Sequence, residues 1–414
     1  MEPPAAVHVT CPCRTMHCGG TMFNTFPFRT AKKILFGTGT IGQVGTELQT
    51  AGARHTLIIT DKTIAAAGWA QKVQDAIQSA GMQSAIWDGA EAEPSVEVGE
   101  KAVDFTRGGG FDSVVGLGGG SAMDIAKAAA VGLTNEGHIM RWIKDGFKRP
   151  LAPLALCPTT AGTGSEVSDT AVFATPELKV GLVSSMLYPD VAIVDPGLTV
   201  SMPGTVTANT GIDALCHAIE GYQSVQANPL TDALALEAMR LVNKYLRRAY
   251  CNGKDMEARE GMALASLLAG IVMGNADTTI GHACGYAYVY PATTLHLPHG
   301  YAIAVTLPYV MEYNALAQFE KHAMIADVLG EDIEDLPLRD AAYLAPVAFK
   351  KLLEDLRLPM SLEEVGVKRD MIPMIANNVL KSPNHCRRNP REVTEEGMLE
   401  LFTHAYEGSL AWEL

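Results

Sequence analysis

The sequence has few positive charges, no long apolar run and few cysteines for its length. It contains 32 Lys and Arg against 46 Asp and Glu, a net charge of -14, which argues against a broad nucleic-acid-binding face. No uninterrupted apolar run approaches the roughly 20 residues that cross a bilayer, and the N-terminus lacks the order of a signal peptide. Eight cysteines fit a reducing compartment better than a disulfide framework. These absences predict a cytoplasmic protein without a nucleic-acid or membrane partner.

The length of 414 residues, 48% of them hydrophobic, predicts two domains that each bury a core. Residues 1–22 are read as a disordered leader because Pro and Gly interrupt them. Cys11, Cys13 and Cys18 cluster there with two histidines, so a small metal or redox site is the alternative, and no function is placed there. The remainder divides into residues 23–200 and 201–414, since Pro and Gly interrupt the pattern between Pro196 and Gly204.

Strand and helix patterns alternate in the first domain. Expected strands lie at 33–37, 56–60, 84–87, 113–117, 154–157 and 191–195, expected helices at 64–80, 95–107 and 122–131, and a hairpin at 171–184. This alternation predicts a parallel sheet covered on both faces, as in nucleotide-binding α/β domains. From residue 207 onward the period becomes helical, as at 232–250, 256–276 and 319–329. The predicted fold is therefore an α/β nucleotide-binding domain followed by an all-α domain.

A glycine-rich loop joins one of these strands to the following helix. Gly118, Gly119, Gly120 and Ser121 stand where backbone N–H groups and the helix dipole bind a pyrophosphate. The glycines are closer together than in the simple dinucleotide fingerprint, and the acidic residue about 20 positions on, Glu136, follows a helix rather than a second strand. A structural turn is the alternative, but it accounts for only one or two of the glycines.

Asp61 ends the expected strand 56–60, at the sheet edge where doubly wound folds bind ligands. A carboxylate there can bind ribose hydroxyls and repel a 2′-phosphate, which favours NAD over NADP. An N-cap for the next helix is an equally good interpretation from the residues alone. Residues 158–166, after another strand, offer hydroxyls and open backbone to the same ligand.

Asp213 and His217 are four residues apart in a stretch without proline, so on a helix they share one face. This is metal-ligand spacing, although an ordinary capped or hydrogen-bonded pair has the same spacing. His282 and His299 are isolated histidines further on. Together the four residues offer one carboxylate and three imidazoles, enough to bind Fe(II) or Zn(II) and leave a position for a substrate oxygen.

The motifs at 118–127, 158–166, 211–222 and 297–300, in this order, resemble those of the iron-containing (group III) alcohol dehydrogenases. The resemblance implies a dehydroquinate-synthase-like fold with the site between the two domains, and a homodimer or larger assembly. It implies metal ligation by Asp213, His217, His282 and His299, and a ribose role for Asp61. By position, its dinucleotide contacts are Gly118, Gly119, Gly120, Ser121, Asp124, Thr159, Thr160, Thr163 and Lys179.

The sequence departs from that family at Tyr286. Many members have a histidine there, four residues after the third ligand, which is thought to assist proton transfer, and the segment between His282 and His299 is also longer here. In having Tyr at this point, the sequence resembles the hydroxyacid-oxoacid transhydrogenases of the same family. Tyr286 and His296 are therefore the candidates for assisting proton transfer.

The hypothesis that follows is reversible, metal-dependent hydride transfer between NAD(H) and a small alcohol, aldehyde or ketone. The alternative is a hydroxyacid-oxoacid transhydrogenase with tightly bound NAD. Two further rivals are a lyase or sugar-phosphate enzyme of the same fold that uses NAD transiently, and a nucleotide-binding protein without catalysis. The basic run at 381–391 is interpreted as a solvated loop.

Overall fold

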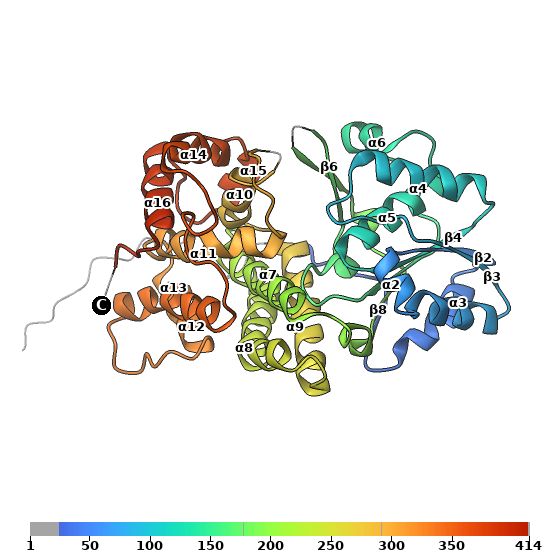
Figure 1. Ribbon diagram of the computed structural model, residues 1–414, viewed down its shortest axis with the longest axis horizontal. Coiled ribbons are helices and arrows are strands. Elements are labelled where there is room, and N and C mark those ends of the chain that lie inside the picture. Colours follow the sequence, from blue (N-terminus) through green and yellow to red (C-terminus); the bar gives the residue numbers. More distant parts are fainter. Residues whose placement is uncertain (1–24, 177, 291, 413–414) are drawn as a thin grey trace, which may run out of the picture.

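The computed structural model describes residues 25–176, 178–290 and 292–412. The predicted leader at 1–22, with its three cysteines, lies outside these residues. Figure 1 shows a half built around a sheet and a helical half, placed side by side along the longest axis. All strands of the main sheet come from Ile34 to Val194, and the chain from Gly204 onward forms helices without a strand in its described part.

The main sheet has six parallel strands in the order β1-β8-β5-β4-β2-β3. They are β1 (Ile34–Phe36), β8 (Val191–Val194), β5 (Leu154–Pro158), β4 (Ser113–Gly118), β2 (His55–Ile59) and β3 (Gln83–Trp87). The central strands β4 and β5 are buried along their whole length, as expected for apolar strands covered on both faces. β2 and β5 flank β4, which places Asp61 and the Thr159 segment on either side of the glycine loop.

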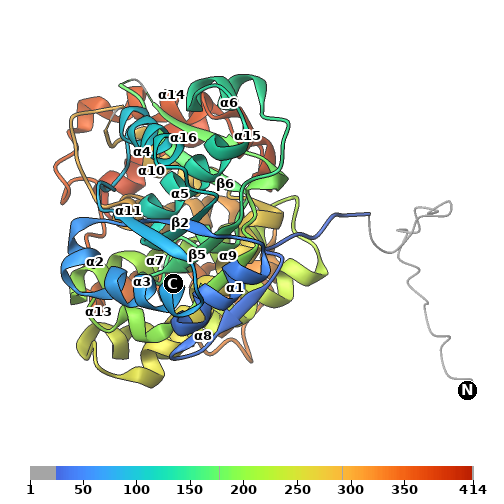
Figure 2. The same ribbon diagram turned by 90° about the vertical axis from the view of Figure 1, so that its right-hand side faces the viewer.

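Helices cover both faces of this sheet (Figure 2). One face is packed by α1 (Val44–Thr50) and α3 (Trp69–Ser79), and the other by α4 (Val96–Gly108), α5 (Gly120–Thr134) and α6 (Ile139–Asp145). The single helix expected at 64–80 is wrong, because it divides into α2 (Lys62–Ala66) and α3. Gly68 separates them with a φ of 84°, a left-handed conformation that glycine adopts without steric cost.

The expected hairpin forms from β6 (Thr170–Ala174) and β7 (Lys179–Val183), which pair antiparallel. It projects from the sheet half toward the helical half (Figure 1). In the helical half the first layer consists of α7 (Gly204–Gln223), α8 (Pro229–Cys251) and α9 (Met256–Ala276). α7 is buried along nearly its whole length from Thr207, so the polar residues it carries lie inside the protein.

The remaining helices pack around α7 and share one large apolar core with it. They are α10 (Ile280–Ala287), α11 (His299–Ala315), α12 (Phe319–Val328), α13 (Leu338–Asp355), α14 (Ile372–Leu380), α15 (Pro383–Arg388) and α16 (Glu395–Glu407). The solvated loop expected at 381–391 is wrong, since α15 forms there and packs on α10. Among the described residues no single helix is long and apolar enough to span a membrane; only α9 and α10 reach that limit jointly, across a 99° bend.

Candidate metal centre and cofactor site

Three polar side chains occupy one face of the buried helix α7. Asp213, His217 and Glu220 follow one another at i, i+4 and i+7, a spacing that places them on the same side of a helix. All three are at most 3% exposed. Burying two carboxylates and an imidazole is costly without partners, so their partners indicate what the face is for.

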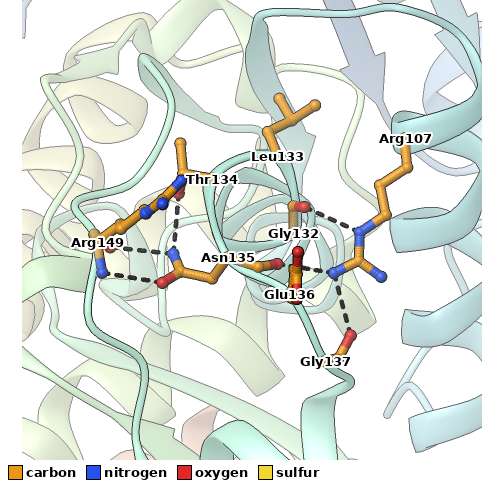
Figure 3. A pocket seen from close by; sticks show the side chains of 8 residues that line it. All are labelled: Arg107, Gly132, Leu133, Thr134, Asn135, Glu136, Gly137 and Arg149. Carbon is orange, nitrogen blue, oxygen red and sulfur yellow. Dashed lines mark hydrogen bonds between the residues drawn. The ribbon is translucent and has the colours of Figure 1, made fainter.

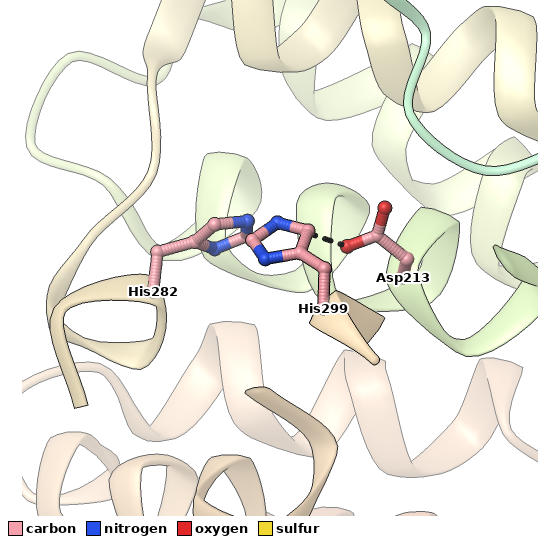
Figure 4. A group of neighbouring side chains, drawn as sticks. All are labelled: Asp213, His282 and His299. Carbon is pink, nitrogen blue, oxygen red and sulfur yellow. Dashed lines mark ion pairs between the residues drawn. The ribbon is translucent and has the colours of Figure 1, made fainter. Parts of the chain in front are cut away.

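Two histidines from other helices meet this face (Figure 4). His282 lies in the first turn of α10, and His299 is the first residue of α11. Asp213 Oδ1 lies 3.9 Å from His217 Nε2 and 3.8 Å from His299 Nε2, and the Nε2 atoms of His217 and His282 are 3.1 Å apart. The structure thus brings together all four residues that the sequence nominated as metal ligands.

Glu220 fixes the orientation of His282. Its Oε2 lies 2.5 Å from His282 Nδ1, and its Oε1 accepts hydrogen bonds from the backbone N–H groups of Thr279 and His282 and from the Thr279 hydroxyl. With Nδ1–H donated to the carboxylate, the Nε2 lone pair of His282 points toward Asp213 and His217. This is the carboxylate–histidine arrangement that supports metal ligands.

Glycine makes this contact possible, because a Cβ on Gly281 would lie only 2.6 Å from the Glu220 carboxyl carbon. His299 is positioned by a similarly close contact between α11 and α7. A Cβ on Gly300 would lie 2.1 Å from the carbonyl oxygen of Asn209, while the Asn209 side chain accepts a hydrogen bond from the Tyr301 N–H. The two glycines that follow or precede these histidines therefore allow α10 and α11 to pack directly on α7.

The donor set fits a divalent cation. Within the described part of the chain, Asp213 Oδ1 is buried and has no hydrogen-bond partner, which is rare for a buried carboxylate oxygen. Burial lowers the pKa of His217, and burial with the nearby charge of Lys179 lowers that of His299, so both imidazoles are neutral near pH 7. Although burial opposes it, Glu220 raises the pKa of His282. Neutral imidazoles with one carboxylate suit iron or zinc.

The glycine loop forms the second part of the site. Gly118 ends β4 with a φ of 154°, and Gly119 is the N-cap of α5. A Cβ on Gly120 would lie 3.0 Å from the Thr163 side chain, and one on Gly119 would lie 3.5 Å from Thr160. Thr160 and Thr163 thus face the loop, and the loop stays open at the N-terminus of a 15-residue helix, where a pyrophosphate is favoured.

The geometry of Asp61 is compatible with both roles that its position suggested. Its Oδ1 accepts hydrogen bonds from the backbone N–H groups of Thr63 and Ile64 and so caps α2. Its Oδ2 points toward the glycine loop, 3.6 Å from where a Cβ on Gly118 would stand. The cap and a contact with a ribose are therefore compatible, because they use different oxygens.

Two other predicted contacts belong to hydrogen-bond networks below the loop. Asp124 accepts hydrogen bonds from the Ser165 hydroxyl and the Val172 N–H, one on each oxygen. Thr159 is buried, and its N–H donates to the Gly118 carbonyl. The adjacent Lys127 donates to Ser165, Ser168 and the Thr170 carbonyl, and burial lowers its pKa to about 8. These groups hold the loop in place, and direct cofactor contacts by Asp124 and Thr159 stay predictions.

A chain of contacts joins the loop to the metal centre. The Glu93 N–H donates to the Ser121 hydroxyl, and the Glu93 carboxylate pairs with Lys179 at 2.9 Å. Lys179 Nζ in turn lies 5.3 Å from the ring centroid of Tyr286. The Tyr286 ring stacks on His299 at 5.5 Å. Lys179 and Tyr286 therefore connect the two halves of the molecule at the site.

His296 is placed differently from the other nominated residues. It is exposed in the segment before α11 and stacks on Tyr290 at 4.8 Å. The described residues include no hydrogen bond from His296 to any metal-centre side chain. Its role in proton transfer stays a prediction.

A surface hollow of about 480 Å³ lies elsewhere, at the C-terminal end of α5 (Figure 3). It is the end opposite the glycine loop, about 22 Å away along the helix. The Arg107 guanidinium donates to the carbonyl oxygens of Gly132, Asn135 and Gly137. Because these carbonyls already satisfy the cation, we place no ligand there.

The geometry agrees with comparisons with known proteins. Residues 31–196 match the family "Iron-containing alcohol dehydrogenase", and residues 207–406 match "Fe-containing alcohol dehydrogenase family, C-terminal". The chain belongs to the iron-containing alcohol dehydrogenase family. As a member, it is an NAD-dependent oxidoreductase that acts on small alcohols or aldehydes and uses a divalent metal.

Relatives in this alcohol dehydrogenase family cover nearly the whole chain. It is 37% identical to a sulfoacetaldehyde reductase of Bilophila wadsworthia, over 92% of this chain and 99% of the relative. It is 33% identical to a mitochondrial hydroxyacid-oxoacid transhydrogenase of Rattus norvegicus, over 89% and 87%. The solved 1,3-propanediol oxidoreductase superposes with a TM-score of 0.88 at 37% identity, over 92% of this chain and all of that one.

Sequence reasoning missed three residues at the site of this dehydrogenase. Glu220 was within reach, because it continues the Asp213 and His217 spacing by one more helical step. Glu93 carried no signal before the structure revealed its left-handed backbone, with a φ of 50°, between Ser121 and Lys179. His385 lies in the run interpreted as a loop, yet its ring meets Tyr286 at 6.5 Å.

Proposed function

We propose that the chain catalyses reversible hydride transfer between NAD(H) and a small alcohol, aldehyde or ketone, with a divalent metal held by Asp213, His217, His282 and His299. The observation that supports this most is the convergence of these donors at one face of α7, with Asp213 Oδ1 buried and left without a partner. A metal bound there would supply Lewis acidity, which favours hydride addition to a carbonyl and loss of an alcohol proton near neutral pH.

The residues around the centre have separate tasks in this proposal. Glu220 holds His282 in the tautomer that offers Nε2. Tyr286 covers His299, and burial, with the charges of Asp213 and Glu220, raises its pKa. Its hydroxyl therefore stays protonated and is able to donate a hydrogen bond to a ligand. We propose that the proton leaves through water and ribose hydroxyls, with Tyr286 or His296 as assisting groups.

The cofactor lies, in this proposal, along the carboxyl ends of β2, β4 and β5. Gly118, Gly119, Gly120 and Ser121 receive the pyrophosphate at the N-terminus of α5, and Thr160 and Thr163 line the facing wall. Asp61 Oδ2 binds the adenosine ribose, and its charge disfavours NADP. Lys179, beside Tyr286, is assigned to the nicotinamide end. Asp124 and Thr159 complete the proposed contacts.

Several finer points belong to the same proposal. Residues 23–200 and 201–414 act as two domains, with the site between them. The metal is Fe(II) or Zn(II), since imidazole and carboxylate bind both. We propose a cytoplasmic homodimer or larger assembly; the location is supported by the five cysteines of the described residues, all of which are free thiols.

The test removes metal with a chelator, restores Fe(II) or Zn(II), and follows NADH oxidation with short aldehydes and ketones. We expect activity to depend on added metal. His282→Ala should lose metal and activity together, whereas Lys351→Ala, at an exposed ion pair on α13, should lose neither. Full activity in metal-free protein would refute the assignment.

A transhydrogenase is the second candidate, supported by the relative that is 33% identical and by Tyr286. In that reaction NAD stays bound while a hydroxyacid reduces an oxoacid. Protein freed of loose cofactor would then transfer deuterium from a labelled hydroxyacid to an oxoacid without added NAD. Absence of that transfer, with aldehyde turnover present, would exclude the second candidate.

A further inference from the structure

Tyr286 and His385 lie together beside the metal centre, although 99 positions separate them in the sequence. Tyr286, on α10, stacks on His299 and meets the edge of His282 at 6.2 Å. His385, on α15, meets the Tyr286 ring edge-on at 6.5 Å between centroids. Figure 1 shows α15 beside α10, at the part of the helical half that faces β6.

The end of α15 that follows His385 is held by contacts with other parts of the chain. Arg388, one turn later, pairs with Asp277 at 2.7 Å, and its carbonyl accepts a hydrogen bond from the Val225 N–H. Asn389 and Asn314 exchange two side-chain hydrogen bonds of 2.9 and 2.8 Å inside the core. A short helix held at this end by an ion pair and a buried amide pair positions its side chains precisely enough to bind a ligand.

The polar atoms of both side chains are available. Among the described residues, neither the Tyr286 hydroxyl nor the His385 ring has a hydrogen-bond partner, and both residues are only partly buried. Polar groups without protein partners beside a reaction centre are those that orient ligands. The hydroxyl donates and accepts hydrogen bonds, and an imidazole offers two ring nitrogens.

The charges around this pair favour a neutral ligand group. Lys179, the cation nearest the Tyr286 ring, is paired with Glu93. Arg388, on the same helix as His385, is paired with Asp277, and Arg387 on that helix is exposed and donates to the Asn384 side chain. Because Lys179 and Arg388 each have a carboxylate partner, neither is free to pair with an anionic substituent of the substrate.

We infer that His385, together with Tyr286, determines specificity by hydrogen bonding a second, neutral oxygen on the carbon chain of the substrate. The preferred substrates are then short hydroxyaldehydes and the corresponding diols. This inference rests on the proposed function, since it concerns the group beyond the carbonyl that is reduced. His385 binds the substrate and takes no part in hydride transfer.

The experiment compares aldehydes of equal size on the metal-loaded full-length enzyme. Glycolaldehyde is paired with propanal, and 3-hydroxypropanal with butanal, each pair differing by a hydroxyl in place of a methyl. Succinic semialdehyde adds an anionic substituent. We expect the wild type to show the higher kcat/KM for the hydroxyaldehyde of each pair and a lower value for the semialdehyde.

His385→Leu should lower kcat/KM for the hydroxyaldehydes about 10- to 100-fold and change it less than about threefold for propanal and butanal. His385→Asn, which keeps a donor and an acceptor, should recover part of the loss. Tyr286→Phe, which removes only the hydroxyl, should also lower kcat/KM more for the hydroxyaldehydes than for propanal and butanal, on top of any loss that all four share through proton transfer. His404→Leu on α16 makes the same substitution outside the site and should leave the ratio unchanged.

Equal losses on both members of a pair would assign His385 a merely structural role and overturn the inference. A wild-type preference for the semialdehyde or for butanal would overturn it as well. Neither result affects the proposed function. That function would instead fail if the metal-loaded wild type reduced none of the five compounds.

Discussion

Replacing Glu220 with Gln tests the metal centre most directly, because it changes one oxygen to nitrogen at almost constant volume. All the groups that Glu220 binds are donors, namely the N–H groups of Thr279 and His282, the Thr279 hydroxyl and His282 Nδ1. Whichever way the new amide turns, its NH₂ faces an N–H group. The imidazole can relieve this conflict only by moving its proton to Nε2, the atom assigned to the metal.

The expected loss of metal affinity and of stability follows from the hydrogen bonds that Glu220→Gln breaks. Loss of a hydrogen-bonded carboxylate behind a metal-binding histidine weakens metal binding about 10- to 100-fold, or about 1.4 to 2.8 kcal/mol. A buried donor left without an acceptor costs about 1 to 3 kcal/mol of folding free energy. We therefore expect Glu220→Gln to bind Fe(II) or Zn(II) at least 10-fold more weakly and to unfold at lower temperature with and without metal.

Competition with a chelator of known affinity measures the metal dissociation constant, and thermal unfolding of the chelated protein measures the second effect. Glu237→Gln, on the exposed side of α8, is the matched control and should match the wild type in both assays. Metal affinity within twofold of wild type in Glu220→Gln would refute the idea that this carboxylate fixes the His282 tautomer.

Three further predictions concern the cofactor loop and the core. Asp61→Asn keeps a capping oxygen but removes the charge, so the ratio of kcat/KM for NADPH to that for NADH should rise about 10-fold or more. Gly120→Ala should raise the KM for NADH several-fold, because the new Cβ stands 3.0 Å from Thr163. Burial lowers the pKa of His322 to about 4, so as pH falls below 6.5 the unfolded chain takes up a proton that the folded chain refuses. About 3 kcal/mol of stability is lost between pH 6.5 and 4, and His322→Gln should make that loss shallower.

Each of these three predictions would be contradicted by a specific result. An unchanged NADPH to NADH ratio would leave Asp61 as a helix cap alone. Gly42→Ala, where nothing lies within 4 Å, is the control for Gly120→Ala, and equal KM values in the two variants would refute the loop argument. A pH profile of unfolding that is identical in wild type and His322→Gln would show that His322 is not the titrating group.

Much of this architecture could be predicted from local patterns. Parallel strands need apolar runs and crossover helices, and both are visible in the sequence. The exception is the stretch 64–80, where the helical period continues across Gly68 and only the three-dimensional turn reveals the break. The glycine loop and Asp61 lie next to each other because β2 and β4 are neighbours in the sheet. The alternation of strands and helices does not by itself determine which strands are neighbours.

The rest of the site depended on contacts between distant segments. Asp213 and His217 share a helix and are indicated by their spacing. His282 and His299 carry no local signal: they were candidates only as isolated histidines, and the resemblance then implied their role. His385 could not be found in either way. It lies on a six-residue helix, too short for a period, and it reaches Tyr286 only because Asn389 and Arg388 are anchored in another part of the chain.

The polar face of α7 also indicates how folding and metal binding are coupled. Glu220 is compensated within the protein, since four donors surround its carboxylate. Asp213 is not, because its Oδ1 is buried without a partner in the described structure and lies 3.9 Å from His217. Burying an uncompensated carboxylate opposes folding, and a cation bound at the centre would remove this cost. A ligand that binds only the folded chain stabilises it by mass action.

The stability of α7, and of α10 and α11 that pack on it, should therefore rise with metal concentration, whereas the stability of the sheet half should rise only indirectly. Hydrogen exchange with and without metal should show the largest change in protection at residues 209–220, 280–287 and 299–305.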